Sequence, residues 1–342
     1  MNSIVVDFER LKNPNTGLYS FSKDLGNALV CQKHTCDLTF FVPQAQKNLF
    51  KNVKTLVYNP VHKIFKPKQN AVWHLTHQGS KFGGKTNILT IHDLNFLIEK
   101  KGNAAKIRSN LKVIQNNINR SEYITCISNF TAQQVNEHLD VGNKPLEVVY
   151  NGCSLQEYPD FESVKFRPKN KFLFSIGTVF KKKNFHVLSN LLLDNDYDLV
   201  IAGILSDKKY VGEILQAAKN NNVLSRVHLV GAVSDPEKYW YYKNCLAFIF
   251  PSIAEGFGLP VIEAMSLGKP VLLSKLNSMP EVGGDLAFYF DSFEPDAMQE
   301  CLNNASLFFG NTNHQNKSVL WSKKFSWEKA SQEYIELYKK LF

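Results

Sequence analysis

The stretch PSIAEGFGLPVIEAMSLGKP, residues 251–270, follows the apolar run LAFIF and contains two glutamates, Glu255 and Glu263. The apolar run predicts a buried strand. Pro260 suits the first turn of a helix, because its missing N–H would have no partner there. Residues 256–259 then form a helix N-terminus, whose backbone N–H groups attract anions and phosphates above all. The stretch therefore predicts a strand, a glycine turn and a helix, with one glutamate before the turn and the other about one helical turn in.

Apolar strands alternate with helices on both sides of this stretch. In the second half we expect strands at KFLFSIG, YDLVIAG, RVHLVG, LAFIF and PVLLS, and helices at NFHVLSNLLL, KYVGEILQAAKN, DPEKYWYYKNC and DAMQECLNNASLFF. The first half repeats the pattern, with strands at SIVVDF, DLTFFV, AVWHLT, NILTIHD and EYITCIS and helices at SFSKDLGNALV and NFTAQQVNEHL. Such alternation predicts parallel sheets covered on both faces, and 342 residues are too many for one core. The sequence therefore predicts an α/β protein of two doubly wound domains, which bind ligands beyond the carboxyl ends of their strands.

Two segments bear on the domain limits. Residues 154–169, within which the polar run SVKFRPKNK begins, are expected to link the two halves. The last segment, FSWEKASQEYIELYKKLF, predicts a helix. Its apolar stripe consists of Trp327, Ala330, Tyr334, Leu337 and Leu341. A lone terminal helix must bury such a stripe, and either domain could accept it.

The positive charge is confined to the first half. Residues 1–150 hold 19 Lys and Arg against 10 Asp and Glu, whereas residues 151–342 hold 21 of each. The first half is therefore expected to face something anionic, such as a membrane surface, a phosphorylated acceptor or nucleic acid. Solubility alone is the alternative explanation. Nucleic acid is disfavoured, because no platform of interleaved aromatic and basic residues accompanies the charge.

Cysteine usage and hydropathy narrow the class of protein. None of the six cysteines forms a C-x-x-C pair, so we expect no zinc site, and Cys126 in an apolar run is typical of a buried free thiol. This pattern favours a reducing compartment. No run of 18 apolar residues is present, and the start MNSIVVDFER lacks the pattern of a secretion signal. We therefore expect a chain that stays in the cytoplasm.

A carboxylate beside a phosphate-binding turn needs neutral groups to accept from. Sugars and riboses supply hydroxyls, so the arrangement around Glu255 and Glu263 suits a sugar nucleotide, with N–H groups for the diphosphate and carboxylates for the hydroxyls. The alternative is a helix cap followed by an exposed helical glutamate. Two glutamates eight residues apart do not by themselves decide between these interpretations.

The context of the glutamates resembles a known family. The segment from VHLVGAVSDPEKYW to MPEVGGDLAFYFD, residues 227–291, is similar to the signature of the retaining glycosyltransferases of family 4. Shorter similarities follow the family's order: NTGLYSFSKDLGNAL, TIHDLNFL, ISNFTAQQV, VVYNGCS and FSIGTVFKKKN. The resemblance implies the GT-B fold, with two Rossmann-like domains facing each other across a cleft and a C-terminal helix that crosses back to the first domain. The implied limits are 1–153 with 328–342 for the acceptor-binding domain and 170–327 for the donor-binding domain.

The resemblance also implies roles for residues that match the family's motifs. Glu255 would contact hydroxyls of the transferred sugar, Glu263 the ribose, and Lys182 with Lys183 the leaving diphosphate. The family more often has Arg at the first position of this pair, and lysine lacks the bidentate fork of arginine. The implied donor-binding set is Gly17, Thr178, Lys182, Lys183, Ala232, Val233, Glu255, Gly256, Phe257, Gly258, Leu259 and Glu263.

Catalytic and acceptor-binding residues are implied in the same way. The catalytic set is Glu255, His92, Asp93 and Lys183, with the backbone carbonyl of His92 facing positive charge on the anomeric carbon. The acceptor-binding set is Tyr19, Asp93, Lys100 and Lys101. We expect no cofactor and no metal ion, because lysines and backbone N–H groups can stabilise the departing diphosphate. The loops also lack an obvious D-x-D pair.

The expected activity is the retaining transfer of a hexose of the mannose or glucose type, from a GDP-mannose or UDP-glucose type donor, to a saccharide or lipid-linked saccharide. The implied process is the biosynthesis of lipopolysaccharide or another cell-surface polysaccharide. Alternatives are a nucleotide-sugar epimerase of the same architecture and a non-catalytic nucleotide-sugar-binding protein. A nicotinamide dehydrogenase is disfavoured, since no G-x-G-x-x-G follows the first strand.

Three basic clusters suggest where the protein works. They consist of Lys63, Lys66 and Lys68, then Lys81 and Lys85, then Lys100, Lys101, Lys106, Arg108 and Lys112. Basic residues near an anionic leaflet contribute about 1 kcal/mol each. We therefore expect peripheral attachment to the inner face of the cytoplasmic membrane. The apolar stripe of the helix around 107–118 is expected to face the core rather than lipid.

Overall fold

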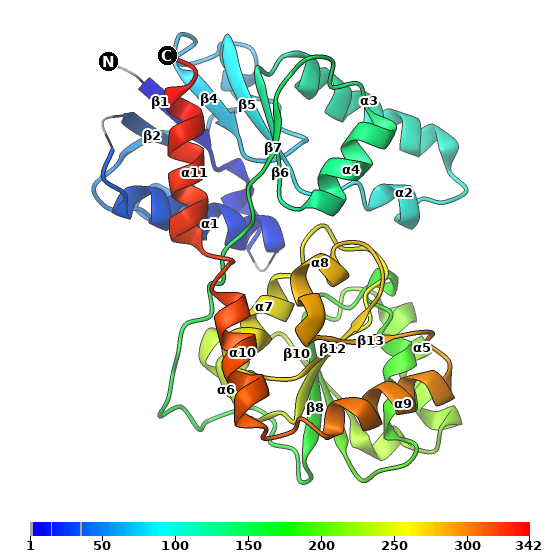
Figure 1. Ribbon diagram of the computed structural model, residues 1–342. Helices are drawn as coiled ribbons and strands as arrows, with labels where there is room; N and C mark the ends of the chain where they lie inside the picture. Colours follow the sequence, from blue (N-terminus) through cyan, green and yellow to red (C-terminus); the bar gives the residue numbers. More distant parts are fainter. Residues whose placement is uncertain (1–2, 15, 35) are drawn as a thin grey trace. The chain divides into compact units, whose positions relative to one another are not determined.

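The computed structural model describes residues 3–14, 16–34 and 36–342, and the chain divides into two compact units. The first unit comprises Met1–Gly152 and Phe325–Phe342, and the second comprises Cys153–Lys324. Each unit has its own sheet with helices packed around it (Figure 1). The predicted α/β class, with two doubly wound domains and a terminal helix that returns to the first of them, is confirmed.

The sheet of the first unit has seven parallel strands in the order β3-β2-β1-β4-β5-β6-β7. Val5 in the interior strand β1 pairs with Thr39 of β2 on one side and with Trp73 of β4 on the other. The strands are β1 Ser3–Asp7, β2 Asp37–Val42, β3 Lys54–Val57, β4 Val72–Leu75, β5 Thr86–Ile91, β6 Tyr123–Cys126 and β7 Leu146–Val148.

Helices flank this sheet and bury apolar faces against it. The α-helices are α1 Gly17–Cys31, α2 Phe96–Glu99, α3 Ala104–Asn119, α4 Asn129–His138 and α11 Trp327–Lys339; the 3-10 turns are η1 Glu9–Lys12, η2 Gln44–Gln46 and η3 Pro60–Lys63. On α3, Ile114 and Ile118 are buried in the core beside Trp73, as expected for a stripe that faces the core. Cys126 is also buried there.

The terminal helix α11 lies against α1 in the first unit (Figure 1). Four members of its predicted stripe, Trp327, Ala330, Tyr334 and Leu337, are buried. Tyr338 is buried as well, and its hydroxyl lies 2.7 Å from Nδ1 of His74 in β4. Hydrogen bonding and apolar burial therefore join residues that are far apart in sequence.

The sheet of the second unit has six parallel strands in the order β10-β9-β8-β11-β12-β13. The strands are β8 Phe172–Ile176, β9 Asp198–Ala202, β10 Val227–Gly231, β11 Ala247–Phe250, β12 Val271–Ser274 and β13 Phe288–Phe290. The α-helices are α5 Lys208–Asn220, α6 Asp235–Asn244, α7 Leu259–Ser266, α8 Met279–Gly283, α9 Pro295–Ser306 and α10 Thr312–Ser322. The 3-10 segments are η4 Lys181–Lys183, η5 Phe185–Leu192, η6 Leu224–Arg226 and η7 Gly284–Leu286.

The structure refines two sequence-based expectations in this unit. The run NFHVLSNLLL, expected as an α-helix, forms the 3-10 segment η5 after Asn184, whose φ of 57° interrupts the helical path. Residues 154–169, expected as a linker, group with the second unit and lie along α6. There the Trp240 indole N–H donates to Glu162, and the Tyr241 hydroxyl donates to the carbonyl of Phe166 at 2.6 Å.

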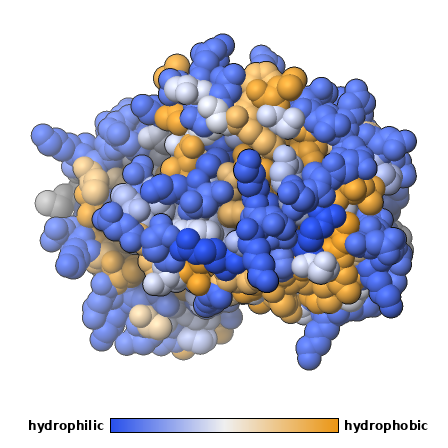
Figure 2. Space-filling model, turned by 90° about the horizontal axis from the view of Figure 1, so that it is seen from below, coloured by the Kyte–Doolittle hydropathy of each residue, from blue (hydrophilic) through white to orange (hydrophobic). Residues whose placement is uncertain are grey.

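The surface mixes hydrophilic and hydrophobic side chains. The face drawn in Figure 2 is mainly hydrophilic, with hydrophobic residues interspersed. Ile64 and Phe65 are 79% and 72% exposed on the segment that follows η3. Within the described ranges, every helix falls short of the length and apolarity that a bilayer crossing requires.

Candidate active site

The strand order of each sheet creates one point where a ligand site is expected. In the second unit the chain runs outward from β8 to β9 and β10, and then returns to β11 on the other side of β8. Ligands of doubly wound folds bind outside the carboxyl ends of the strands at such a reversal. The loop after β8 contains η4, and the loop after β11 leads through Glu255 to α7. The topology thus brings two of the predicted motifs to one place.

At this reversal the Lys183 ammonium makes a direct ion pair with Oε1 of Glu255. Both side chains are largely buried, with 12% and 15% of their surfaces exposed. The ammonium also lies 4.7 Å from the ring centroid of Phe250, the last residue of β11. The Ser252 hydroxyl approaches the same carboxylate oxygen at 2.8 Å. A fixed cation and a fixed carboxylate therefore sit together at the carboxyl end of the sheet.

Hydroxyl and amide side chains hold the loop that carries Glu255. The Ser278 hydroxyl contacts the carbonyls of Glu255 and Phe257 at 3.2 and 2.9 Å. Asn277, at a φ of 59°, donates from Nδ2 to the carbonyl of Ile253 at 2.8 Å. The N–H of Ile253 donates in turn to the carbonyl of Lys182, which ties the two loops together.

Gly258 makes the turn into α7 possible. Its φ of 109° lies in a region that side chains disfavour, and a Cβ there would come within 2.6 Å of Cε of Met279. Leu259 is the first residue of the helix and Pro260 the second, as the sequence predicts. The helix N-terminus therefore begins at the glycine turn.

Glu263 lies one turn further along α7 and is largely buried. Its carboxylate accepts from Nζ of Lys238 at 2.9 Å and from the Tyr242 hydroxyl at 3.0 Å, both on α6. Burial, and then the nearby carboxylate, raise the pKa of Tyr242 well above its usual value, so the phenol keeps its proton and donates. The carboxylate is held by two partners, and each oxygen keeps a lone pair for a further donor.

Glycines lie at the carboxyl edge of this sheet, directly after β8 and β9 and as the last residue of β10. Gly177, Gly203 and Gly231 all have positive φ, and a Cβ on Gly203 would lie 2.0 Å from the carbonyl oxygen of Gly177. The ends of these neighbouring strands are therefore packed backbone against backbone. Of the residues predicted to lie near the base, Ala232 is exposed, and its carbonyl accepts from Lys165 at 3.0 Å. Predicted Thr178 and Val233 are half-buried.

The first unit has its own reversal between β1 and β4, and charged groups gather there. The Arg10 guanidinium donates from Nε to Nε2 of His77 at 2.9 Å, and Nε2 of His77 also lies 3.8 Å from Glu9. Burial raises the pKa of Glu9, but the neighbouring His77 and the cations of Lys12 and Arg10 outweigh it and lower that pKa to about 2. Beside this cluster Asp7 accepts from the Ser80 hydroxyl, and burial raises the pKa of Asp7.

His92 and Asp93 follow β5 at the same edge of that sheet. The His92 imidazole is buried, and Nε2 lies 2.7 Å from the carbonyl of Thr76. Burial lowers the pKa of His92 to about 4, so the ring is neutral and donates from Nε2. Its backbone carbonyl accepts from the Thr131 hydroxyl at 3.2 Å, and one lone pair of that oxygen remains. Asp93 accepts from the backbone N–H of Asn95 at 3.0 Å.

The other predicted residues of the first unit lie on helices α1 and α2 or directly after them. Gly17 is the first residue of α1, with open space around it, and Tyr19 donates its backbone N–H to the Thr16 hydroxyl that caps the helix. Lys100 and Lys101 are exposed at the end of α2. The structure therefore brings His92 and Asp93 to one sheet edge, and the roles of the four acceptor residues stay a prediction.

Several residues of the two sites were not identified from the sequence. In the second unit these are the residues that hold the glutamates: Ser252, Ser278, Lys238 and Tyr242. In the first unit they are Arg10, Glu9 and His77 at the strand reversal. Their position in the sequence could have pointed to them, because they follow β1 and β4, the two strands between which a doubly wound sheet reverses.

Within residues 3–14, 16–34 and 36–342, no three His, Cys, Asp or Glu side chains group in a way that could hold a metal ion. The expected independence from metal stays a prediction.

Comparisons with known proteins find a family match within the second unit. Residues 158–307 match the family model described as Glycosyl transferases group 1. The O-antigen chain mannosyltransferase B of Escherichia coli is 25% identical over 273 residues, covering 74% of this chain and 70% of that protein. The O-antigen chain mannosyltransferase RfbU of Salmonella typhimurium is 21% identical, covering 88% and 90%.

Solved structures support the fold alone. The sucrose-phosphate synthase of Thermosynechococcus elongatus superposes with a TM-score of 0.78 at 15% identity, covering 100% of this chain and 99% of that one. The match extends over the whole chain, including the part that lies outside the family model.

Proposed function

Residues 158–307 belong to the glycosyl transferases group 1 family, and from this premise we propose that the chain is a retaining, metal-independent hexosyltransferase. The donor is a nucleoside-diphosphate sugar, and the acceptor is a saccharide or lipid-linked saccharide in the biosynthesis of O-antigen, lipopolysaccharide or a similar polysaccharide. The mannosyltransferases among the relatives favour a mannose-type sugar.

The ion pair between Lys183 and Glu255 carries this proposal. A buried ammonium at the carboxyl ends of parallel strands is placed to meet the negative charge of a departing diphosphate. The carboxylate beside it accepts hydrogen bonds from sugar hydroxyls, and Ser252 fixes its orientation. One α-helical turn into α7, Glu263 offers a second carboxylate for the ribose hydroxyls.

The chemistry follows from this placement. The bond between the anomeric carbon and the diphosphate oxygen breaks, and its electron pair leaves with the nucleoside diphosphate. The acceptor hydroxyl forms a new bond to the same face of that carbon, and its proton passes to the departing phosphate oxygen. Lys183, Lys182 and the N-terminus of α7 stabilise the charge on the leaving group, each donor contributing about 3 kcal/mol.

A panel of nucleotide sugars tests this function against its two alternatives. The chain is incubated with each donor, with and without a saccharide acceptor, and the free diphosphate and the sugar product are both measured. Diphosphate release that requires the acceptor supports transfer. A changed nucleotide sugar without release supports epimerisation, and binding with neither outcome supports a non-catalytic protein. Thermal shifts with UDP, GDP and ADP identify the base.

Glu255→Gln separates the catalytic role from the fold. The amide keeps the shape of the side chain and can still accept from Ser252, but it loses the charge that pairs with Lys183. We expect kcat/KM for transfer to fall about 10²–10³-fold. The control is Glu213→Gln, because Glu213 pairs at 3.7 Å with the exposed Lys181 on the same unit. Transfer at the unaltered rate by Glu255→Gln would contradict the proposed role.

We further propose that the protein attaches peripherally to the cytoplasmic membrane face through its first unit. The segment after η3 places the exposed Ile64 and Phe65 between Lys63 and Lys66. Apolar side chains flanked by basic ones suit the boundary between anionic headgroups and acyl chains. Lys68, expected in the same basic cluster, donates instead to the Thr39 hydroxyl at 2.7 Å.

A further inference from the structure

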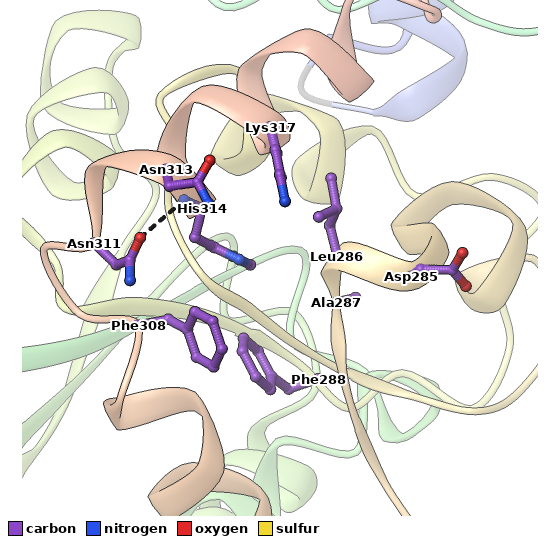
Figure 3. Close-up of a pocket in the computed structure, with 9 residues that line it drawn as sticks. All are labelled: Asp285, Leu286, Ala287, Phe288, Phe308, Asn311, Asn313, His314 and Lys317. Atoms are coloured by element: carbon purple, nitrogen blue, oxygen red, sulfur yellow. Dashed lines mark hydrogen bonds between the residues drawn. The ribbon is translucent and has the colours of Figure 1, made fainter.

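A separate pocket of about 240 Å³ lies in the Cys153–Lys324 unit. It is bounded by η7, the start of β13, the segment after α9 and the first turns of α10 (Figure 3). Since β13 is parallel to its neighbours, its first residue Phe288 lies toward the amino edge of the sheet, whereas Lys183 and Glu255 lie at the carboxyl edge. The pocket shares no lining residue with the candidate active site.

Three rings form an apolar wall of this pocket. Phe288, Phe308 and His314 have ring centroids 5.1 to 5.7 Å apart and are tilted by 37° to 54° to one another. Figure 3 shows the two phenylalanine rings side by side next to the imidazole. Both phenylalanines are only half-buried, so part of each ring is left for a ligand.

His314 supplies a buried polar atom without a partner. Its backbone N–H donates to Oδ1 of Asn311 at 3.0 Å, the bond drawn in Figure 3, which fixes the residue in the first turn of α10. The residue is 7% exposed, and within the part of the chain that the structure describes its Nε2 has no hydrogen-bond partner. An unsatisfied buried polar atom is costly and calls for an explanation, and a ligand in the pocket provides one.

The rim of the pocket is polar and balanced in charge. Asp285 and Lys317 contribute opposite charges, and Asn311 and Asn313 contribute neutral amides. Burial, and then the neighbouring lysine, lower the pKa of His314, so the imidazole is neutral at pH 7. This balance disfavours an ionic ligand and favours a neutral one with many hydroxyls.

We propose that this pocket binds one pyranose unit of a neutral saccharide. A pyranose has a face of C–H groups that can lie on Phe288 and Phe308, and a rim of hydroxyls for Asp285, Asn313 and Nε2 of His314. Sites for drug-sized ligands measure about 300–1,000 Å³, so this smaller volume suits a single sugar ring. The proposal does not depend on transfer activity; if the chain is a saccharide transferase, the pocket is a second contact with the glycan.

Saturation-transfer NMR on the full chain tests this site. The probes are the methyl glycosides of mannose, glucose and galactose, each measured alone and with excess UDP or GDP, and adenosine as an aromatic comparison. We expect at least one glycoside to receive saturation, mainly on the protons of one ring face, and its signal to persist with nucleotide present. Asp285→Ala and Asn313→Ala, at exposed positions, should each weaken binding about five- to tenfold, since each removes hydrogen bonds to hydroxyls. The matched control Asn304→Ala, at an exposed position of α9, should leave binding unchanged.

Four results would overturn the proposal. They are no saturation of any glycoside, an equal signal in the Asp285 and Asn313 variants, displacement of the glycoside by nucleotide, and a variant-sensitive signal from adenosine with none from the glycosides. Displacement by nucleotide would place the sugar in the candidate active site and leave the proposed transfer function intact. Conversely, if the chain fails to transfer sugar but binds a glycoside in a way that depends on Asn313, the proposed pocket stands and the proposed transfer function fails.

Discussion

Lys181 and Lys183 lie two residues apart in η4 and have different electrostatic surroundings. Lys181 is 75% exposed and pairs with Glu213 at 3.7 Å, whereas Lys183 is largely buried against Glu255 and the ring of Phe250. Water screens an exposed charge, so an exposed ion pair contributes little to stability. A buried ammonium is screened less, so it interacts more strongly with negative charge that develops nearby. The sequence KKKN does not distinguish these lysines, but the fold does.

This difference predicts unequal effects of two alanine substitutions. Lys183→Ala should lower kcat/KM for sugar transfer about 10²–10³-fold, because it removes a donor aimed at the leaving diphosphate. Lys181→Ala should change it less than about threefold, because its charge is solvated. Initial rates of diphosphate release measure both. Equal losses in the two variants would mean that the net charge of the loop matters and the position of the ammonium does not.

Two buried histidines of the first unit predict a dependence of stability on pH. Burial lowers the pKa of His74 to about 3 and that of His92 to about 4, below the ordinary value of 6.5. Below pH 6.5 these two imidazoles bind protons in the unfolded chain but stay neutral in the folded protein. Their contribution is therefore complete above pH 6.5 and is lost as the pH falls toward 4 for His92 and toward 3 for His74. Between pH 6.5 and 5 each should reduce the free energy of unfolding by about 2 kcal/mol.

His74→Gln tests the sign and size of this effect. Glutamine can still hydrogen-bond to Tyr338 and Thr90 but does not titrate in this range. We expect the variant to lose about 2 kcal/mol less than the natural protein between pH 6.5 and 5, as measured by urea-dependent amide exchange in β4 and β5. Parallel pH profiles for the two proteins would show that burial does not lower the pKa of His74.

At the scale of elements, the ends of β8 and β9 depend on two glycines. Gly203→Ala would place a Cβ 2.0 Å from the carbonyl oxygen of Gly177, at a φ of 136° that alanine disfavours. We expect a loss of several kcal/mol in the free energy of unfolding, or no folded second unit. Gly212→Ala is the matched control, because it lies inside α5 with open space around it and should gain about 0.5–1 kcal/mol. Urea unfolding of the second unit distinguishes them, and equal stabilities would contradict the close approach.

The elements also show which parts of the fold a sequence reveals. Most strands and helices of both sheets were predicted, because apolar periodicity marks the face that packs on a core. Helix α10 was missed because the residues it buries are polar, namely His314, Ser318 and Ser322, so no apolar stripe marks it. The segment η5 was expected as an α-helix, since a continuous apolar run does not distinguish an α-helix from a 3-10 helix.

The sequence predicts individual residues of the candidate site but not the contacts between them. Glu255 and Lys183 could each be identified within a local pattern, but their ion pair joins residues 72 positions apart and depends on the adjacency of β8 and β11. The same applies to Glu263 with Lys238 and Tyr242, which belong to a different helix. Local patterns predict a residue's role, and the order of strands in the sheet decides its partner.

At the scale of the whole molecule, the two units differ in net charge. The excess of nine basic residues in residues 1–150 stays with the first unit, since residues 325–342 add three acidic and three basic side chains. The second unit carries no net charge. An anionic surface should therefore attract the molecule through its first unit, and the exposed Ile64 and Phe65 lie in that unit.

This asymmetry predicts how the protein binds vesicles. The full chain should float with liposomes that contain anionic lipid and should bind neutral ones weakly, with binding that falls as salt rises. The double variant Ile64→Asp and Phe65→Asp should lose most of the binding, because it replaces two apolar groups at the lipid boundary with negative charge. Its fold should be unaffected, since both side chains are exposed. Leu320→Asp is the matched control: that leucine is 69% exposed on the second unit, and its substitution should leave flotation unchanged. Equal losses in both proteins, or flotation that salt does not alter, would show that the segment after η3 is not the membrane contact.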